Sequence, residues 1–585
     1  MGKRWRIHAH DLDRIASLQR AVEIPAVVAQ LLICRGITDP TLARSFLDPK
    51  LTDLRDPEAL PGCREAARRI HEAVGRRRKI VVYGDYDVDG MAATAILYLC
   101  LRLLGADVSY YVPHRIDEGY GLSCEAVRSW GSGRAEMMIT VDCGIGSVEE
   151  ADLARQLGLE LIVTDHHEPG VRLPDAAAIV HPRLPGSSYP FGGLSGAGVA
   201  FKLAWAVCQQ ASGARKVSPR MKDFLVQAVG LAALGTVADV VPLVDENRVL
   251  VYHGLESLAR CPTLGLATLG KIAKVEPRRG PGGAGRLDSD DVAFSLAPRL
   301  NAAGRLGQPQ LAVELLVTDR PDRARELAEY IDQLNASRQT LERSIQLAAT
   351  KMLKDEFDPE RDAAVVLAER GWHPGVLGIV AGRLAEKYHR PAVLISWDNV
   401  GTRPGMGSAR SIPGFNLHTA LAACDAFLLA HGGHAAAAGL RIAEDQFEGF
   451  RAAFGEIAAA EIGEDQRVAD LWIDAEATLS AFTPQAVAQI ERLSPFGQHN
   501  ARPLLCTSGV TLDGPPKPIG GGRHLSMRLS QHGVGLRAVA FGAADWADEL
   551  GAVARPIDIA FRPVINAFQG RRSVELHLVD WRPGN

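Results

Sequence analysis

The sequence lacks the features of disulfide-bonded, zinc-binding and membrane proteins. Its nine cysteines are scattered and form no C-x-x-C pair, which argues against a zinc site or a disulfide framework and fits a reducing cytoplasm. No stretch approaches the ~18 consecutive apolar residues of a membrane span, and the first residues include no apolar segment. We therefore expect a soluble, cytoplasmic protein with no membrane partner.

The sequence also lacks an excess of positive charge. With 65 Lys and Arg against 69 Asp and Glu, the net charge of −4 gives no overall support for nucleic-acid binding, so any such site must be a local basic surface. One basic cluster precedes the first predicted strand. Such a cluster is more often a solvated helix face than a phosphate contact. It comprises Arg68, Arg69, Arg76, Arg77, Arg78 and Lys79.

The most informative stretch is an acidic turn, Asp85-Tyr86-Asp87-Val88-Asp89-Gly90, between a β-branched run at 80–83 and a helix-like run from Met91. In an extended segment residues i, i+2 and i+4 share one face, so we expect Asp85, Asp87 and Asp89 to point the same way. Three close carboxylates repel one another unless a cation lies among them. Hard oxygen ligands of this kind suit Mn²⁺, Mg²⁺ or Ca²⁺.

Two other interpretations of this turn are open to test. A polar turn that happens to be acidic is an ordinary feature of a protein surface. An EF-hand calcium loop also begins D-x-D-x-D-G, but it requires a Glu at its twelfth position and a helix before the loop. The twelfth residue here is Ile96, and the turn follows a strand-like run, so the EF-hand interpretation fails.

Residues 79 to about 244 repeat a pattern of apolar strand, loop and helix, with strands predicted at 80–83, 108–112, 137–141 and 161–164. This alternation predicts a mostly parallel sheet covered by helices, whose ligands lie at the carboxyl ends of the strands. Acidic and imidazole residues recur there: Asp142 follows the third strand, and Asp165, His166 and His167 follow the fourth. Asp239 is expected to end a further apolar run.

Each of these groups has an ordinary explanation when taken alone. A lone Asp at a strand end is more often a helix cap than a ligand, and a His-His pair is usually structural. Four such groups within one block of the sequence favour a shared ligand site over four independent structural roles. Five or six carboxylates and a histidine that converge at one sheet edge would be untenable without a metal ion.

The order and spacing of these motifs resemble the DHH phosphoesterase superfamily. Later motifs narrow the resemblance to the bacterial single-stranded-DNA exonucleases of that superfamily, over nearly the whole chain from about residue 60. They lie at 297–305 (APRLNAAGR), 371–375 (GWHPG), 407–411 (GSARS), 431–434 (HGGH) and 495–500 (PFGQHN).

The resemblance implies two Mn²⁺ or Mg²⁺ ions per active site, bridged by Asp142. Asp85 and Asp87 would complete the ligands of one ion, and Asp89, His166 and Asp239 those of the other. His167 would contact the scissile phosphate or assist the leaving group, with Asp165 orienting an imidazole. Many relatives carry a His where Tyr83 stands, so Asp85 is taken as the substitute ligand. Implied substrate-binding residues are Arg115, Arg305, Ser408, Arg410 and His434.

The resemblance also implies a 5′→3′ exonuclease on single-stranded DNA that releases 5′-mononucleotides in DNA repair and recombination. The expected partners are single-stranded DNA, a helicase and a single-strand-binding protein, and the expected state is a monomer. Two other functions remain to be weighed. A small-molecule enzyme of the superfamily, acting on cyclic dinucleotides, short oligonucleotides or polyphosphate, would have no use for the predicted C-terminal barrel. A catalytically inactive DNA-binding relative would not need all four acidic motifs.

The expected fold class is α/β, with a parallel-sheet DHH domain and a DHHA1 domain joined by a long helix, followed by an OB-fold β-barrel. The helix is predicted from Pro321 to about Phe357, and its narrow apolar stripe, interrupted by Arg338, leaves a coiled-coil seam as the alternative. The candidates for a basic groove with stacking rings on the barrel are Lys517, Arg523, Phe541, Arg562, Phe568, Arg571 and Arg572. The predicted divisions are 1–60 (a helical lead-in, taken as an appendage), 61–250 (DHH), 251–358 (helical region and long helix), 359–460 (DHHA1) and 461–585 (barrel).

Overall fold

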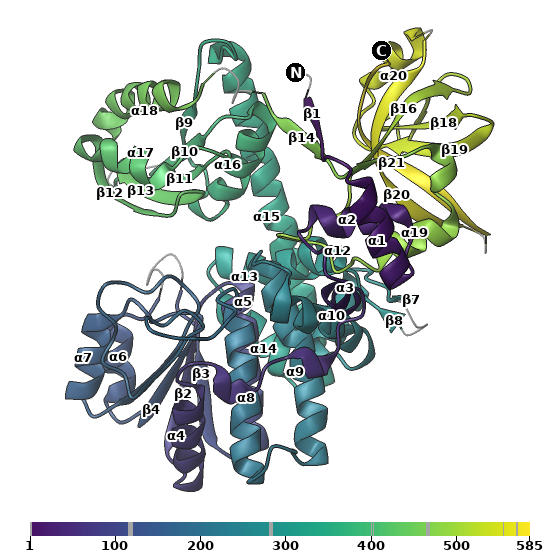
Figure 1. Cartoon of the computed structure of the whole chain (residues 1–585). Helices are drawn as coiled ribbons and strands as arrows, with labels where there is room; N and C mark the ends of the chain where they lie inside the picture. The colour runs from purple at the N-terminus through teal and green to yellow at the C-terminus, as the bar shows by residue number, and fades with distance from the viewer. Residues whose placement is uncertain are drawn as a thin grey trace.

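The computed structural model describes the chain except residues 1–2, 115–120, 280–284, 399–400, 402, 464–467, 554, 569–570 and 585. Its described residues form two α/β lobes and a β-barrel (Figure 1). The first lobe holds a five-stranded sheet in the order β3-β2-β4-β5-β6 in which every pairing is parallel. Its strands are β2 (Lys79–Gly84), β3 (Asp107–Tyr111), β4 (Met137–Val141), β5 (Glu160–Thr164) and β6 (Ala178–Val180).

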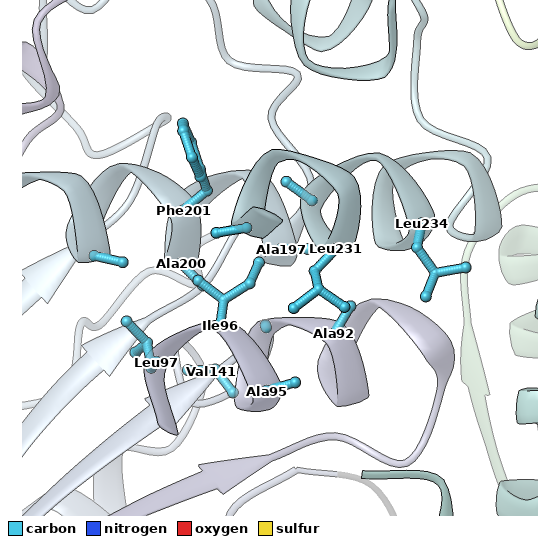
Figure 2. Close-up of a cluster of buried hydrophobic side chains, with 14 of the residues drawn as sticks. Ala92, Ala95, Ile96, Leu97, Val141, Ala197, Ala200, Phe201, Leu231 and Leu234 are labelled. Atoms are coloured by element: carbon cyan, nitrogen blue, oxygen red, sulfur yellow. The ribbon is translucent and has the colours of Figure 1, made fainter. Parts of the chain in front are cut away.

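Helices cover both faces of this sheet. On one face α5 (Val88–Leu103) packs against α8 (Gly196–Ser212) and α9 (Pro219–Ala238). Figure 2 shows Ile96 of α5 pointing toward Ala197 and Ala200 of α8, in the same buried cluster as Leu231 of α9. On the other face, α6 (Cys124–Gly131) and α7 (Val148–Gln156) cover Val81, Met138 and Val163. In the described ranges α9 is the one single helix long and apolar enough to cross a membrane, and it is packed against α5, α8 and α10 (Asp245–Arg260).

One long helix joins the two lobes. Helix α15 (Pro321–Glu356) has 36 residues, about 54 Å at 1.5 Å per residue. Its first half buries Leu327 and Ile331 in the core of the first lobe, and its second half buries Ile345 and Leu353 in the core of the second. Because the apolar stripe is covered within one chain, it is not a coiled-coil seam. Between the halves Arg338 is buried and pairs with Glu342, which also pairs with Arg383 of the second lobe.

The second lobe is a mixed sheet in the order β12-β13-β11-β10-β9, in which β9 and β10 are parallel and the other pairs are antiparallel. Its strands are β9 (Val365–Arg370), β10 (Ala392–Trp397), β11 (Gly405–Arg410), β12 (Leu428–Gly433) and β13 (Ala437–Ile442). Helix α16 (Pro374–Tyr388) packs on β10 and β11, and α17 (Leu417–Ala423) and α18 (Phe447–Glu461) complete the lobe.

The C-terminal strands close into a barrel. β16 pairs with both β20 and β18, which closes the ring β16-β20-β21-β19-β18. The ring strands are β16 (Leu505–Leu512), β18 (His524–Gln531), β19 (Val534–Ala540), β20 (Ile557–Phe568) and β21 (Arg571–Pro583). A closed five-stranded ring is the architecture of an OB-fold. The predicted fold class is therefore confirmed: two α/β lobes joined by a long helix, plus a β-barrel.

The N-terminal helices are part of the barrel rather than an appendage, which corrects the interpretation of residues 1–60. β1 (Arg4–Ile7) pairs with β14 (Asp470–Ile473) in parallel. α1 (Leu12–Val22), α2 (Ala26–Cys34) and α3 (Pro40–Leu47) share one hydrophobic core with the barrel. Figure 1 shows these purple helices beside the yellow strands. Sequence reasoning missed this because the partners of these helices lie more than 400 residues away.

The basic cluster before β2 is engaged in surface ion pairs. Arg68 pairs with Glu65 and Glu72 within α4 (Cys63–Gly75), and Arg69 and Arg78 both pair with Glu160. These contacts of three arginines fit the solvated helix face, and the other three residues, Arg76, Arg77 and Lys79, are exposed.

Candidate metal centre

Acidic side chains meet at the carboxyl edge of the first sheet. The sheet order places β2 beside β4, and Asp85, Asp142 and the Asp165–His167 group follow β2, β4 and β5. In a doubly wound parallel sheet, this edge is where ligands bind, next to the point at which the strand order reverses. Residues up to 82 positions apart in sequence are thus brought together by the fold.

The acidic turn is not extended as expected, because helix α5 begins at Val88. Asp87 is its N-cap, whose side chain accepts a hydrogen bond from Gly90 N at 3.0 Å, and Asp89 lies in the first helical turn. An Asp at an N-cap and another in the first turn both favour the helix start. Asp85 and Asp89 are buried. The carboxylates therefore gather by a strand-to-helix turn, not by strand alternation.

Asp142 is held in a left-handed backbone conformation, with φ of 61°. Such a conformation is uncommon for a residue with a side chain and recurs at functional sites. The turn is fixed by a hydrogen bond from Asp142 N to Thr164 O at 3.0 Å and one from Thr140 Oγ1 to Cys143 O at 2.8 Å. This geometry directs the Asp142 carboxylate into the centre of the cluster.

Asp239 belongs to a helix end rather than to a strand end, which corrects the expectation for the last acidic group. It is the C-cap of α9, and its N–H donates to Gly235 O at 2.9 Å. The apolar run before it continues a 20-residue helix that begins at Pro219. Because that helix is largely buried, its run has no clear period, and such a run reads equally well as a strand.

His166 lies among three of these carboxylates. Its Nε2 is 3.1 Å from Asp142 Oδ1, 3.5 Å from Asp239 Oδ2 and 3.9 Å from Asp89 Oδ2. Burial, together with the charge of His167, lowers the pKa of His166 to about 3, so its imidazole is neutral at physiological pH. A neutral imidazole is the form that binds a metal ion.

The ligand atoms fall into three overlapping sets, and within each set all atoms lie within 4.8 Å of one another. The sets are Asp85, Asp87 and Asp142; Asp89, His166 and Asp239; and Asp142, His166 and His167. Asp142 Oδ1, His166 Nε2 and Asp239 Oδ2 are buried and make no hydrogen bond within the described part of the chain. Buried polar atoms of this kind require a partner. Carboxylates with one imidazole fit Mn²⁺ or Mg²⁺.

Electrostatics point to the same requirement. Burial and the charge of Asp87 raise the pKa of Asp89 to about 7, and burial with the charges of Asp89 and Asp87 raises that of Asp239 to about 9. Burial and the neighbouring carboxylates also raise the pKa of Asp142 well above its usual range. The protein alone therefore does not keep all of these groups ionised at neutral pH, whereas divalent cations among them would.

Several supporting residues were missed by sequence reasoning. The Asp89 carboxylate accepts hydrogen bonds from Gly196 N at 2.6 Å and Ala197 N at 2.9 Å, at the start of helix α8. A Cβ at Gly196 would collide with the Asp142 carboxylate, and a Cβ at Gly235 would collide with that of Asp89. The sequence signal was the small-residue run at 195–198, but only the fold shows what approaches it.

His167, which shares a ligand set with Asp142 and His166, is also paired with Asp165. His167 Nδ1 is hydrogen-bonded to Asp165 Oδ1 at 2.7 Å, and Asp165 Oδ2 accepts from Ile145 N at 2.9 Å. Burial lowers the pKa of His167, but the hydrogen bond and the charge of Asp165 outweigh it and raise that pKa above the usual value. Burial opposes ionisation of Asp165, yet the hydrogen bonds and the charge of His167 bring its pKa to about 2. The ionised carboxylate thus orients the imidazole.

The Tyr83 side chain lies in the core that α6 and α7 cover. It is buried on the opposite face of the sheet with Val81, and its hydroxyl donates to Gly121 O at 3.1 Å. Asp85 is therefore the ligand candidate that directly follows β2.

Helix α13 (Ala297–Arg305) connects the acidic turn to the second lobe. Asn301 Oδ1 accepts from Val88 N at 3.2 Å, and a Cβ at Gly304 would collide with the carbonyl oxygen of Tyr86. At the end of this helix, Arg305 Nη1 donates to Gly375 O of α16 at 3.1 Å. The motif at 297–305 thus connects the acidic turn to the start of α16.

Ser408 and Arg410 lie on β11 against the same helix. Arg410 Nη1 donates to Ser408 Oγ at 3.3 Å, and a Cβ at Gly378 of α16 would lie 2.7 Å from Arg410 Nη2 and 2.9 Å from Ser408 Oγ. Arg305, Ser408 and Arg410 therefore converge on the N-terminal half of α16. His434 is in the turn between β12 and β13 and is separated from β11 by β13. Arg115 lies outside the described residues.

A cavity of about 2020 Å³ opens between the first lobe, α15 and the barrel. Two of its lining phenylalanines are exposed, Phe294 at 76% and Phe541 at 57%. Its arginines are Arg278, Arg286, Arg305, Arg338, Arg492, Arg502, Arg562 and Arg572. Of the expected barrel groove, Phe541, Arg562 and Arg572 line the cavity, Lys517 and Arg523 do not, and the side chains of Phe568 and Arg571 are outside the described part.

Three sequence profiles match the chain: "DHH family, N-terminal domain" at residues 79–236, "DHHA1 domain" at 362–460 and "RecJ OB domain" at 473–580. The single-stranded-DNA-specific exonuclease RecJ of Bacillus subtilis is 38% identical, over 99% of this chain and 70% of that protein. The RecJ enzyme of Haemophilus influenzae is 36% identical over 92% of this chain and 93% of that protein. The RecJ enzyme of Escherichia coli is 33% identical over 98% of this chain and 99% of that protein. The structure of Thermus thermophilus RecJ in complex with Mn²⁺ superposes with a TM-score of 0.82 at 33% identity, covering 100% of this chain and 80% of that one.

Binding of a divalent cation should release protons and strengthen as pH rises. Asp89 and Asp239, with pKa values raised to about 7 and about 9, are partly or fully protonated at pH 7 and must lose their protons to bind a cation. Affinity for Mn²⁺ should therefore rise from pH 6 to pH 9, measured by calorimetry in buffers of different ionisation enthalpy. Asp239→Asn should reduce the proton release, whereas Asp223→Asn, at an exposed position of the same helix, should not. An affinity independent of pH and buffer would contradict the assignment.

Proposed function

This chain belongs to the RecJ family of single-stranded-DNA-specific exonucleases, and from that membership we propose how its residues cut DNA. It is a metal-dependent exonuclease that hydrolyses single-stranded DNA, with Mn²⁺ or Mg²⁺ as cofactor. We propose that it works in the 5′→3′ direction and releases 5′-mononucleotides. The observation that carries the mechanism is the convergence of five aspartates and His166 at one edge of the first sheet.

Two ions would share this site. Asp85 and Asp87 would hold one ion, Asp89, His166 and Asp239 the other, and Asp142 would bridge both; the sets of adjacent ligand atoms support this division. The chemistry that two such ions supply when bound is activation of a water for attack on phosphorus and neutralisation of charge on the phosphate. The backbone N–H groups of Gly196 and Ala197 hold Asp89 in place for this task.

His167 is the proposed contact to the scissile phosphate or the leaving oxygen. Its raised pKa keeps the imidazole protonated to higher pH than usual, so it can donate a hydrogen bond or a proton to the oxygen that leaves. Asp165 is a positioning residue, because it contacts the imidazole rather than the DNA.

Phosphate binding is assigned to the place where α13, α16 and β11 meet. Arg305, Ser408 and Arg410 offer guanidinium and hydroxyl donors beside the N-terminal half of α16, whose dipole also favours an anion. Arg115 and His434 stay as further candidates from sequence resemblance alone.

The cavity favours a polymer over a small substrate. At about 2020 Å³ it exceeds the roughly 300–1,000 Å³ of small-molecule pockets. The exposed Arg562 and Arg572 would contact phosphates, and Phe294 and Phe541 would stack on bases, whose faces are accessible in a single strand. These features argue against a small-molecule phosphoesterase, and the complete acidic set argues against a catalytically inactive DNA-binding relative.

The wider setting follows from this activity. We place the enzyme in the cytoplasm, in DNA repair and recombination, where single strands must be degraded. We further propose that it acts as a monomer, together with a helicase that exposes the strand and a single-strand-binding protein that covers it.

A DNA strand labelled at its 3′ end tests the activity. With Mn²⁺, the purified protein should shorten the single strand from its 5′ end and spare a matched duplex. Asp142→Asn should reduce the rate by a factor of 100 or more while the protein stays folded by circular dichroism, because a shared ligand is lost. Asp175→Asn, an exposed carboxylate in the same lobe, is the control. Cleavage at the wild-type rate by the Asp142 variant would refute the metal assignment.

A second test addresses the phosphate contacts. Arg410→Ala should weaken binding of single-stranded DNA and leave Mn²⁺ affinity unchanged. If Arg410 neutralises a phosphate, the slope of log K against log salt should fall by about 0.7. Arg441→Ala, on the neighbouring strand β13 and exposed, should change neither quantity. An unchanged slope in the Arg410 variant would show that this side chain serves folding only.

A further inference from the structure

One buried arginine at the base of the barrel has no part in the chemistry above. Arg248 on α10 is 2% exposed, and in the described part of the chain no carboxylate pairs with it. Its guanidinium instead donates to backbone carbonyls. Nε and Nη2 reach Phe46 O at 3.0 and 2.8 Å, Nη1 reaches Leu493 O at 2.9 Å, and Nη2 reaches Ser494 O at 2.9 Å.

A buried cation without a counter-ion is costly unless its surroundings are negative. Here Phe46 lies in the last turn of α3, and Leu493 and Ser494 directly follow the C-cap of α19 (Pro484–Glu491), so the carbonyls lie at or just beyond helix ends where the dipole is negative. The guanidinium also lies 3.6 Å from the centre of the Phe46 ring. Burial and the charges of Arg286 and Arg35 lower the pKa of Arg248 to about 9, which leaves it charged at neutral pH.

This contact joins three parts of the molecule: the metal lobe through α10, the N-terminal helices through α3, and the barrel through α19. Nearby hydrogen bonds join the same parts, from Leu243 N to Gln498 O at 2.8 Å and from Ser289 Oγ to Phe496 O at 2.7 Å. The segment 494–498 also lines the cavity. The motif at 495–500, which the chemistry leaves unexplained, is thus the strap between metal lobe and barrel.

We infer that Arg248 is a positioning residue for long single-stranded DNA. By holding the carbonyls of Leu493 and Ser494, it fixes the strap and with it the barrel wall of the cavity. When a DNA strand binds along that wall, its end is held near the metal centre. The effective concentration of the strand end at the metal centre is therefore higher. A dinucleotide, which spans the metal centre alone, gains nothing from this. The inference rests on the proposed function.

The test compares a long oligonucleotide with a dinucleotide as substrates for full-length protein. Arg248→Met should raise KM for the long strand about tenfold or more, in line with the loss of a linked binding surface. Its kcat and KM on the dinucleotide should match those of the wild type. Arg248→Lys keeps the positive charge but loses the fork of hydrogen-bond donors. Its KM for the long strand should lie between that of the wild type and that of the Met variant. Arg260→Met, on the same helix and 67% exposed, is the control.

Each outcome is decisive. An equal loss on both substrates would overturn the inference, because Arg248 would then serve the folding of the metal lobe. No change on either substrate would also overturn it. Hydrogen exchange provides a second readout, with faster exchange expected at 494–500 in the Met variant and unchanged exchange in β2 and β4. If the wild-type protein cut neither substrate, the proposed function would fail, and the exchange measurement would still test the strap.

Discussion

Mutual repulsion among buried carboxylates is the constraint on which the rest of this structure depends. Asp85, Asp89, Asp142 and Asp239 are brought to one sheet edge, where burial and their own charges raise the pKa values of the last three. The His166 imidazole, which lies among Asp89, Asp142 and Asp239, is neutral and does not balance their charge. The arrangement is stable as an ionised set only with metal ions, so the fold and the cofactor specify each other.

The backbone around this sheet edge allows the helices to approach the carboxylates closely. A left-handed turn aims Asp142, glycines at 196 and 235 let two helices come within contact of carboxylates, and the start of α8 holds Asp89. From the same edge, α13 reaches the second lobe through Arg305, while α15 is shared by the cores of both lobes. The metal centre, the second lobe and the barrel are therefore connected by continuous contacts, and Arg248 joins the first lobe to the segment that follows α19.

Much of this could be predicted from the sequence, because the strand pattern and the polar residues after each strand are local signals. The lobes, the long helix and the barrel follow from periodicity and family motifs. Three features could not be predicted. The run before Asp239 is apolar throughout and carries no period that separates a helix from a strand. The role of Gly196 depends on what approaches it. The N-terminal helices find their core in the distant barrel, which no local pattern reveals.

The most direct test of the account is anomalous diffraction at the manganese edge from a crystal of this protein grown with Mn²⁺. The account predicts two peaks about 3.5–4 Å apart, with Asp142 in contact with both, Asp85 and Asp87 at one, and Asp89, His166 and Asp239 at the other. A single peak, or two peaks with Asp142 bound to neither, would contradict the claim that a shared carboxylate organises the site.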